Sequence, residues 1–599
     1  MLSAQRLDDN PCRPRHFKPP PCAPVIADGA AAEFLDNTRT RLLLAAALFA
    51  LIFVVIAGRL VDVVAMAGAG NDMRTARSRL VVPPPPVRAD IVDRNGTLLA
   101  TNLDSPALYV DSKIMLQAGE DPEAAARAIT AALPDLSLAA IRAKLASGKS
   151  FAYLTRSLTP RQEYAINNLG IPGVEFERGE KRRYPLGDLF AHVVGYCNVD
   201  NIGQAGLERG LNPAIKGHGK PVMLALDARV QFVLKDELQQ VITQFDAKGA
   251  AGIIMNVRTG EIVAMASLPD FDPNHPPTTD PKQETADDKD RIFNKITSGE
   301  YELGSVFKIF NTAMALDNGV ATMTSTFDAR NPIKIGRFTI EDYHGKHRVL
   351  SVPEIFAYSS NIGSARMAVA AGARMQHDFL AKLGLLEPVP IEFDKVEVGR
   401  PHFPPFPAQW REVNVMTIAF GHGIAVTPLH MITATAAMIN GGILHPPTML
   451  KVPAGGKVPG VRVISQKTSD QIRKLMRLVV ESGTAKQAEA QGYVVGGKTG
   501  TAEKNIHGHY EEKRLVSSFI GAFPMNDPQY VILTLVDEPH GNKESHGYAT
   551  AGWTVAPATS RIIQRIAPLL GVAPVDENSP AIVNALKIES LAGKKLEYN

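Results

Sequence analysis

The chain has 599 residues, of which 45% are hydrophobic and 21% are charged. This balance is ordinary for globular proteins and excludes a largely disordered chain, and the length predicts roughly two to four domains. Lysine and arginine number 64 against 61 acidic residues, so the near-neutral formal charge of +3 gives no reason to expect a nucleic-acid partner. The three cysteines are too few and too widely spaced for a disulfide framework or a zinc site: Cys12, Cys22 and Cys197.

The first 38 residues are rich in proline, which occurs at Pro11, Pro14, Pro19, Pro20, Pro21 and Pro24. Proline lacks a backbone N–H group and fixes its own φ angle, so this stretch cannot nucleate a helix or a sheet. We therefore expect residues 1–38 to form a disordered tail.

An uncharged apolar stretch runs from Leu42 to Gly58. Its roughly 17 residues reach the lower end of the length that spans a bilayer as a helix. Arg39 and Arg41 precede it, and such basic residues remain on the cytoplasmic side of a membrane. The sequence therefore predicts a transmembrane helix with its flanks over residues 39–66, a cytoplasmic N-terminus and export of the rest of the chain.

Two other interpretations of the apolar stretch fit the sequence less well. A buried core helix is hard to reconcile with the arginine pair and the proline-rich leader before it. A cleaved signal peptide is favoured by the small residues of Ala65-Met66-Ala67, but the leader of about 41 residues is too long for its usual charged segment. We expect an uncleaved anchor.

Short strands and helices are predicted after the anchor, over residues 80–220. A proline-rich run at 81–86 predicts a stiff connector, and Asn95-Gly96 between apolar residues predicts a hairpin turn. Alanine-rich periodicity over 120–147 and the pattern of 160–169 predict helices. We expect these elements to form one α+β module.

Residues 221–573 are predicted to form a second domain of the α/β class. An amphipathic helix over 227–245 is followed by two strands within 252–267, which are joined at a Thr259-Gly260 turn. A further amphipathic helix over 552–570 closes the domain. Strands at both sequence ends with helices between them predict an antiparallel sheet that is built from distant segments and flanked by helices.

The far end of this domain contains three apolar segments, at 493–498, 515–523 and 530–536. Short links between them predict an antiparallel meander, with a polar turn over 504–512. Residues 574–599 show no firm pattern, and we expect them to form a C-terminal tail.

The string Ser305-Val-Phe-Lys308 predicts an activated serine. Serine is a poor nucleophile at neutral pH and needs a neighbouring base, and positions 305 and 308 share one face of a helix. Gly304 allows a sharp turn into that helix, whose N-terminus favours developing negative charge. Lys308 can act as the base only if it is neutral, and burial together with a second cation such as Lys498 would lower its pKa.

Two further strings follow Ser305 in the chain: Ser359-Ser-Asn361 and Lys498-Thr-Gly-Thr501. Ser359-Ser-Asn361 lies between two predicted helices, where the Ser359 hydroxyl can relay a proton and the Asn361 amide can hold Lys308 and the substrate. Each such string alone is common and is more often a solvated helix face, a cap or a strand end. Their order and local context together predict acyl-transfer chemistry.

The third string, Lys498-Thr-Gly-Thr501, lies on a predicted strand. Gly500 lacks a side chain, so a substrate can lie along the backbone as an added strand. The backbone N–H groups of Ser305 and Thr501 are candidate oxyanion donors. Lys498 and Thr499 precede Thr501 on the same predicted strand.

At these residues the chain resembles the class B penicillin-binding proteins, which are serine D,D-transpeptidases that cross-link peptidoglycan. The resemblance extends from the anchor to about residue 570. It includes Asp93-Arg-Asn-Gly96, Arg183-Tyr-Pro185 and Gly206-Leu-Glu208 of the family's N-terminal pedestal domain, and Tyr301-Glu-Leu-Gly-Ser305 and Lys498-Thr-Gly-Thr-Ala502 of its transpeptidase domain. The short anchor, Ser359-Ser-Asn361 and the segment Phe420 to Pro428 are most similar to the division-specific (septal), FtsI-type subfamily.

The resemblance implies a role for each motif residue. Ser305 would be the acylated nucleophile, Lys308 its base, and Ser359 and Asn361 would position groups and shuttle protons. The substrate's terminal carboxylate would be bound by Lys498, Thr499 and Thr501, beside Gly500. No metal or organic cofactor is implied. Ala89-Asp90 and Leu303 depart from the family pattern, which often has glycine and proline there, and neither touches the proposed chemistry.

The resemblance also implies ligands, partners and a location. Peptidoglycan stem peptides ending in D-Ala-D-Ala and β-lactam inhibitors would bind at Ser305. Divisome membrane proteins, including a septal polytopic glycosyltransferase, would be partners. The chain would be a single-pass protein of the bacterial inner membrane, with its catalytic domain in the periplasm.

Other functions share part of this pattern. A serine β-lactamase has the three strings but would lack the roughly 240 residues between the anchor and Ser305. A bifunctional synthase would need a glycosyltransferase domain in that interval, which is too small. An elongation-specific class B relative and a non-catalytic penicillin-binding sensor or scaffold remain as alternatives.

Overall fold

The computed structural model describes residues 29–70, 88–217, 219–336, 338–506 and 509–591. The chain divides into two compact units, Met1–Pro85 and Pro86–Asn599. The predictions made for residues 1–28 and for the connector at 81–86 lie outside the described residues.

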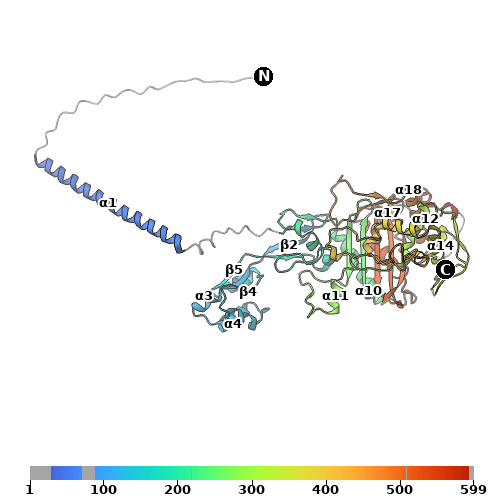
Figure 1. Ribbon diagram of the computed structural model, residues 1–599, viewed down its shortest axis with the longest axis horizontal. Helices are drawn as coiled ribbons and strands as arrows, with labels where there is room; N and C mark the ends of the chain where they lie inside the picture. The colour runs from blue at the N-terminus through green and yellow to red at the C-terminus, as the bar shows by residue number, and fades with distance from the viewer. Residues whose placement is uncertain (1–28, 71–87, 218, 337, 507–508, 592–599) are drawn as a thin grey trace, which may run out of the picture. The chain divides into compact units, whose positions relative to one another are not determined.

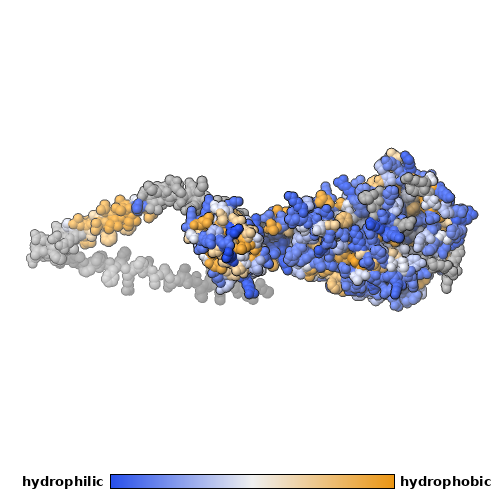
Figure 2. Space-filling model, turned by 90° about the horizontal axis from the view of Figure 1, so that it is seen from below, coloured by the Kyte–Doolittle hydropathy of each residue, from blue (hydrophilic) through white to orange (hydrophobic). Residues whose placement is uncertain are grey.

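The described residues of the first unit form one long helix, α1 (Gly29–Gly70). Its stretch Leu42–Val61 is long and apolar enough to cross a membrane, and its side chains are exposed in the structure (Figures 1 and 2). The prediction of a single-pass anchor here is consistent with this helix. The expected disorder is wrong for residues 29–38, because the last proline is Pro24 and the helix-forming residues Ala30 to Glu33 follow Gly29.

A small four-stranded sheet begins the second unit, in the order β6-β2-β1-β7. Its strands are β1 (Ile91–Val92), β2 (Leu98–Asp104), β6 (Glu180–Arg183) and β7 (Val222–Met223). The predicted Asn95-Gly96 turn is confirmed: it joins β1 to β2, and Gly96 has a φ of +88° that favours glycine. The Asp93 carboxylate accepts from the N–H groups of Asn95 and Thr97 at 2.8 Å and fixes this turn.

A buried ion cluster joins separate segments of this module. The Glu208 carboxylate is fully buried and binds the guanidinium groups of Arg88 and Arg182, with the Arg182 Nε donating at 2.6 Å. Glu208 lies on α8 (Gly206–Gly210) and Arg182 lies on β6. Removing Glu208 would leave both guanidinium groups buried without a carboxylate partner, so the cluster specifies how these segments meet.

A second lobe of the module has its own hydrophobic core, around Leu108, Met115 and Ile129. A three-stranded sheet in the order β4-β3-β5 contributes to it, with β3 (Ala107–Val110), β4 (Ala152–Thr155) and β5 (Val174–Glu177). The helices predicted over 120–147 and 160–169 are confirmed as α4 (Pro122–Ala132), α5 (Leu138–Leu145) and α6 (Pro160–Asn167). A further helix, α3 (Ser112–Gln117), precedes them and was not predicted. The remaining short helices of the module are η1 (Gly187–Phe190), α7 (Ala191–Val194) and α9 (Asn212–Ile215).

The larger domain is built on a five-stranded antiparallel sheet in the order β16-β17-β18-β8-β9. The strands are β8 (Gly249–Asn256), β9 (Ile262–Leu268), β16 (Gly496–Ile506), β17 (His509–Phe523) and β18 (Tyr530–Asp537). β18 pairs with β8, so the predicted sheet of sequence-distant segments is confirmed, and Figure 1 shows green strands in one sheet with orange ones. β16 forms one edge of this sheet.

The polar turn predicted over 504–512 is too long, because the two strands continue through most of this segment. Lys504 pairs with Glu511 and Ile506 pairs with His509, beyond a register shift after Glu503. The Lys504 ammonium lies 2.6 Å from the Asp537 carboxylate, and this ion pair lets a charged residue occupy the strand. The polar composition of this segment therefore did not show where the two strands end.

Helices flank this sheet. α10 (Ala228–Phe245) and α19 (Val555–Ile566) contact each other, and together they contact β8, β9, β17 and β18. α17 (Pro428–Ile439) contacts β8 and β18, and α18 (Gln466–Ser482) contacts β16. The predicted helices over 227–245 and 552–570 are confirmed, with slightly shorter bounds. Further helices of this domain are α11 (Ala286–Ile292), η2 (Gly304–Phe307), α12 (Lys308–Asp317), α13 (Val352–Tyr358), α14 (Asn361–Ala371), α15 (Ala373–Lys382), η3 (Lys395–Glu397), α16 (Glu412–Ile418) and η4 (Lys486–Ala488).

Three two-stranded sheets lie outside the main sheet. They pair β10 (Thr326–Asp328) with β13 (Val349–Ser351), β11 (Ile333–Ile335) with β12 (Phe338–Ile340), and β14 (Ile443–Leu444) with β15 (Val461–Arg462). The residues just after β12 contribute to the candidate active site.

The expected C-terminal tail is held against the domain over its described part. The Glu577 carboxylate accepts from the Gly492 N–H and binds Arg477 on α18, and the Val575 N–H donates to the Gly492 carbonyl at 2.8 Å. Apolar residues of α20 (Pro580–Leu586) pack on the core, and η5 (Glu589–Leu591) follows. These contacts are long-range, which is why no local pattern indicated them.

Candidate active site

Ser305 lies on η2, one turn before α12, and is partly exposed. Gly304 has a φ of +61°, and a Cβ atom there would lie 3.0 Å from the Thr501 carbonyl oxygen. Both the backbone conformation and this close approach favour glycine. The sharp turn therefore brings Ser305 next to the edge strand β16.

The Lys308 side chain is fully buried behind Ser305. Its Nζ lies 2.8 Å from Ser305 Oγ, 2.7 Å from Asn361 Oδ1, and 2.6 and 3.1 Å from the carbonyl and hydroxyl oxygens of Ser359. Burial and the repulsion of Lys498 lower the pKa of Lys308 well below its usual range, while Asp342 opposes this shift. The amine is therefore biased toward the neutral form that a base requires.

Ser359 occupies a left-handed backbone conformation, with φ 60° and ψ 38°. Such a conformation is uncommon for a residue with a side chain and is often found at functional sites. It ends α13 and turns both oxygens of Ser359 toward Lys308. The Ser359 hydroxyl also lies 2.9 Å from Lys498 Nζ, so it bridges the two lysines.

The turn that carries Ser359 is held by the segment after β12, which the sequence analysis missed. The Asp342 carboxylate accepts from the Ser360 hydroxyl at 2.7 Å and from the Ile362 N–H at 3.0 Å. The Asn361 amide donates to the Glu341 carbonyl at 3.0 Å, which orients its oxygen toward Lys308. A lone aspartate in a polar stretch gave no signal for this role.

Lys498 points from β16 into the same site and is fully buried. Burial lowers its pKa to about 7, from the ordinary value of 10.5. Besides the Ser359 hydroxyl, its Nζ contacts the Thr499 carbonyl at 3.2 Å. The structure thus brings together side chains from all three predicted strings.

Methionine in place of Lys498 is expected to stabilise the fold. Between about pH 7 and 10.5 the unfolded chain binds a proton at Lys498 that the folded chain does not, so this group lowers stability as the pH falls through that window. An apolar side chain of similar length should raise the free energy of unfolding at pH 7.5 by about 1–4 kcal/mol. Urea unfolding at pH 7.5 and pH 10 measures this, and the gain should shrink at pH 10. Lower stability of the variant at pH 7.5 would contradict the assignment of Lys498 as a destabilising buried amine.

Gly500 also allows a close contact within the protein that was not predicted. A Cβ atom at this position would lie 2.3 Å from the Leu303 carbonyl oxygen and 3.1 Å from the Val306 side chain. The missing side chain therefore lets β16 pack against the segment that carries Ser305. Among the described strands β16 pairs only with β17, so its other edge can accept an added strand.

Thr499 and Thr501 alternate with Lys498 and Gly500 along β16, so they share the other face of the strand. The Thr501 hydroxyl oxygen accepts from the Ala551 N–H at 3.2 Å. The Thr499 hydroxyl oxygen lies 2.6 Å from that of Thr484, a residue that the sequence analysis did not single out.

Glu302 connects the segment before Ser305 to the start of β17. Its carboxylate accepts from the Tyr510 hydroxyl at 2.9 Å and from the Gly423 N–H at 3.2 Å, and burial raises its pKa. His422 lies beside Tyr510 with their ring centroids 5.7 Å apart. These contacts fix the β16–β17 hairpin over the Ser305 segment.

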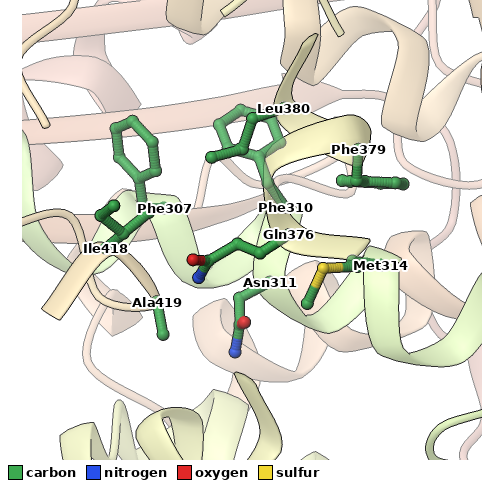
Figure 3. A pocket seen from close by; sticks show the side chains of 9 residues that line it. All are labelled: Phe307, Phe310, Asn311, Met314, Gln376, Phe379, Leu380, Ile418 and Ala419. Atoms are coloured by element: carbon green, nitrogen blue, oxygen red, sulfur yellow. The ribbon is translucent and has the colours of Figure 1, made fainter. Parts of the chain in front are cut away.

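A small cavity behind α12 is separate from this site. Figure 3 shows the side chains around it, most of them apolar: Phe307, Phe310, Asn311, Met314, Gln376, Phe379, Leu380, Ile418 and Ala419. Neither Ser305 nor Lys308 lines it. The two amides bind neighbouring backbone, since Asn311 donates to the Ser364 carbonyl at 3.1 Å and Gln376 to the Val415 carbonyl at 3.0 Å. We interpret the cavity as a gap in packing.

Comparison with protein families covers most of the chain. Residues 250–559 match the penicillin-binding protein transpeptidase domain, and residues 83–243 match the penicillin-binding protein dimerisation domain. A Caulobacter vibrioides protein named probable peptidoglycan D,D-transpeptidase FtsI is 43% identical over 498 residues, covering 81% of this chain and 82% of that protein. The chain belongs to the class B penicillin-binding proteins. The predicted resemblance is confirmed, as is the two-domain fold with a candidate membrane helix.

Two further comparisons support the assignment to this family. The probable peptidoglycan D,D-transpeptidase PenA of Neisseria meningitidis is 30% identical over 543 residues, which cover 86% of this chain and 89% of that protein. Penicillin-binding protein 3 of Mycobacterium tuberculosis, solved in complex with aztreonam, matches with a TM-score of 0.63 over 82% of this chain and 98% of that one. At 24% identity this last likeness concerns the fold alone. The side chains that meet around Ser305 all lie within the transpeptidase domain of this class B penicillin-binding protein: Ser305, Lys308, Ser359, Asn361 and Lys498.

Proposed function

We propose that this peptidoglycan D,D-transpeptidase acts through an acyl-enzyme on Ser305 and works at the division septum. One observation carries the chemical part: Ser305 Oγ lies 2.8 Å from the buried amine of Lys308, inside a cluster completed by Ser359, Asn361 and Lys498. A hydroxyl and a neutral amine at hydrogen-bond distance form an activated nucleophile with its base.

In the first step Lys308 takes the proton of Ser305 as its oxygen attacks the penultimate D-Ala carbonyl of a stem peptide. The backbone N–H groups of Ser305 and Thr501 would stabilise the oxyanion, because Gly304 holds these two segments in contact. Asn361 keeps the Lys308 amine aimed at Ser305.

The second step breaks the carbon–nitrogen bond and releases terminal D-Ala. Its amine needs a proton, and the Ser359 hydroxyl lies 3.1 Å from Lys308 and 2.9 Å from Lys498. Ser359 can therefore pass the proton from Lys308 to the leaving amine and be reprotonated from the lysine side. Lys498 keeps this hydroxyl in place.

Substrate binding is assigned to the edge strand β16. A stem peptide added along this edge would place its terminal carboxylate near Lys498 and the hydroxyl groups of Thr499 and Thr501. Gly500 holds the strand close enough to Ser305 for the carbonyl to be reached.

The acyl group is then transferred to the amine of a neighbouring stem, which forms the cross-link. β-Lactams resemble the donor and acylate Ser305 in the same way, but their leaving group stays attached to the acyl product and the enzyme stalls. Stem peptides and β-lactams are therefore ligands of one site.

The septal assignment and the membrane orientation rest on further support. Arg39 and Arg41 precede the apolar part of α1, which favours a cytoplasmic N-terminus and a periplasmic catalytic domain at the inner membrane. The relative that is 43% identical is named FtsI, which favours division over elongation. We propose divisome membrane proteins as partners, including a septal polytopic glycosyltransferase.

A fluorescent fusion of the full chain, expressed in place of the native copy, tests the septal role. We expect signal at midcell in dividing cells, and uniform sidewall signal would favour the elongation alternative. The purified chain, given a pentapeptide donor and an acceptor amine, should release D-Ala and form the cross-linked product. Penicillin binding without any D-Ala release would support the sensor alternative instead.

A further inference from the structure

Thr484 lies in the loop between α18 and η4, at a junction of several segments. A Cβ atom at the preceding Gly483 would lie 2.8 Å from the Ala357 carbonyl, near the end of α13. The Thr484 carbonyl itself would lie 2.7 Å from a Cβ atom at Gly552. The loop is therefore wedged between the helix that ends in Ser359 and the segment that leads into α19.

The Thr484 hydroxyl contacts one functional group of the site. Its oxygen lies 2.6 Å from the hydroxyl oxygen of Thr499 on β16, and this contact is partly buried. One of the two hydroxyls must donate to the other. The direction decides what Thr499 can offer to a ligand, because a hydroxyl that accepts from a neighbour keeps its own proton to give.

Thr501 illustrates the favourable direction on the same face of β16. Its hydroxyl oxygen accepts from the Ala551 N–H, a backbone donor that cannot reverse, so its proton is available for another acceptor. A carboxylate only accepts hydrogen bonds. If each threonine hydroxyl oxygen accepts a hydrogen bond from a neighbouring protein group, both hydroxyl protons can point to the terminal carboxylate of a donor peptide.

We propose that Thr484 is a positioning residue that donates to Thr499 Oγ1 and thereby turns the Thr499 proton toward the substrate carboxylate. Thr484 makes the site selective for donors that end in a free carboxylate. This inference rests on the proposed function, which assigns carboxylate binding to Thr499.

Thr484→Val removes the hydroxyl and keeps the shape of the side chain, and Thr484→Ser keeps the hydroxyl. We compare a depsipeptide donor that ends in a free carboxylate with the methyl ester of the same donor. Thr484→Val should raise KM for the carboxylate donor about five- to tenfold and leave kcat nearly unchanged. Thr484→Ser should restore the wild-type KM, and the ester should react equally with all three proteins.

Two controls separate positioning from a structural effect. Thr243→Val, at an exposed threonine on α10, should change neither parameter. In a Thr499→Val background, Thr484→Val should add no further loss, because the two hydroxyls act as one unit. An equal loss on both donors, or a loss that adds to that of Thr499→Val, overturns the inference.

The two proposals fail in different ways. If the wild-type protein did not distinguish the carboxylate donor from its ester, carboxylate binding by Thr499 would be wrong. If the wild type distinguished them and Thr484→Val did so equally well, only the role of Thr484 would be wrong. Thermal melting of each variant identifies any loss that comes from unfolding.

Discussion

Ser305→Ala is expected to abolish covalent labelling by benzylpenicillin while the chain keeps its fold. The variant lacks the only atom that would bond to the acyl group, and removal of a catalytic serine lowers turnover by about 10⁶-fold in a well-studied serine protease. The change deletes one oxygen from a partly exposed side chain, so the core is untouched. Labelling with a fluorescent penicillin, followed by gel electrophoresis under denaturing conditions, measures the result.

Ser359 is the rival nucleophile, since its hydroxyl lies 3.1 Å from Lys308 and 2.9 Å from Lys498. Persistent labelling of Ser305→Ala would show that the nucleophile assignment is wrong, and peptide mapping would then identify the acylated residue. Ser147→Ala, at an exposed serine of the N-terminal module, is the matched control and should label like the wild type. A normal melting temperature confirms that a silent variant is folded.

The site could be predicted from the sequence where its groups are local or lie at helical and strand spacing. Ser305 and Lys308 are three residues apart at the start of a helix, and their side chains meet as expected. Lys498 was predicted as the second cation that lowers the pKa of Lys308, and its repulsion contributes to that shift. These features follow from side-chain periodicity and from elementary electrostatics.

Other parts of the site depend on contacts between distant segments and could not be predicted. Asp342 holds the turn that contains Ser359, Tyr510 binds Glu302, and Thr484 contacts Thr499. Each is a single polar residue in a stretch without periodicity, so only the folded chain gives it a role. The left-handed backbone of Ser359 is likewise a product of the packing around it.

The fold, like the site, could be predicted where its pattern is local and could not where it depends on contacts between distant segments. Apolar periodicity indicated the strands of the main sheet and the long helix α10. The bounds of α10 and β18 agree closely with the prediction, whereas β16 and β17 extend into the segment predicted as a turn. Composition alone misjudged residues 504–512, where Lys504 is neutralised by Asp537 across the sheet. It also misjudged the C-terminal segment, because Glu577 finds its partners far away in sequence at Arg477 and Gly492.

Lys308→Arg is expected to lower the rate of Ser305 acylation by about 10³- to 10⁴-fold, although it keeps a positive charge at this position. Arginine stays protonated at all accessible pH values, so it cannot take the serine proton. A lysine that acted only as a cation or a hydrogen-bond donor would be replaced by arginine with a much smaller loss. Stopped-flow acylation with a chromogenic β-lactam measures the difference, and Lys308→Met shows the effect of removing the amine altogether.

The pH dependence of the same reaction distinguishes the two roles independently. The neutral amine is the active form, so the wild-type acylation rate should rise with pH and level off above the pKa of Lys308. Burial and the nearby Lys498 lower that pKa well below its usual range, so the rise should lie below the pH at which an exposed lysine titrates. Lys308→Arg should lack this rise, because arginine has no neutral form to populate. A rate in the arginine variant that is near the wild-type value and flat with pH would remove Lys308 from the role of base, and its contacts with Ser359 and Asn361 would then serve only to orient Ser305.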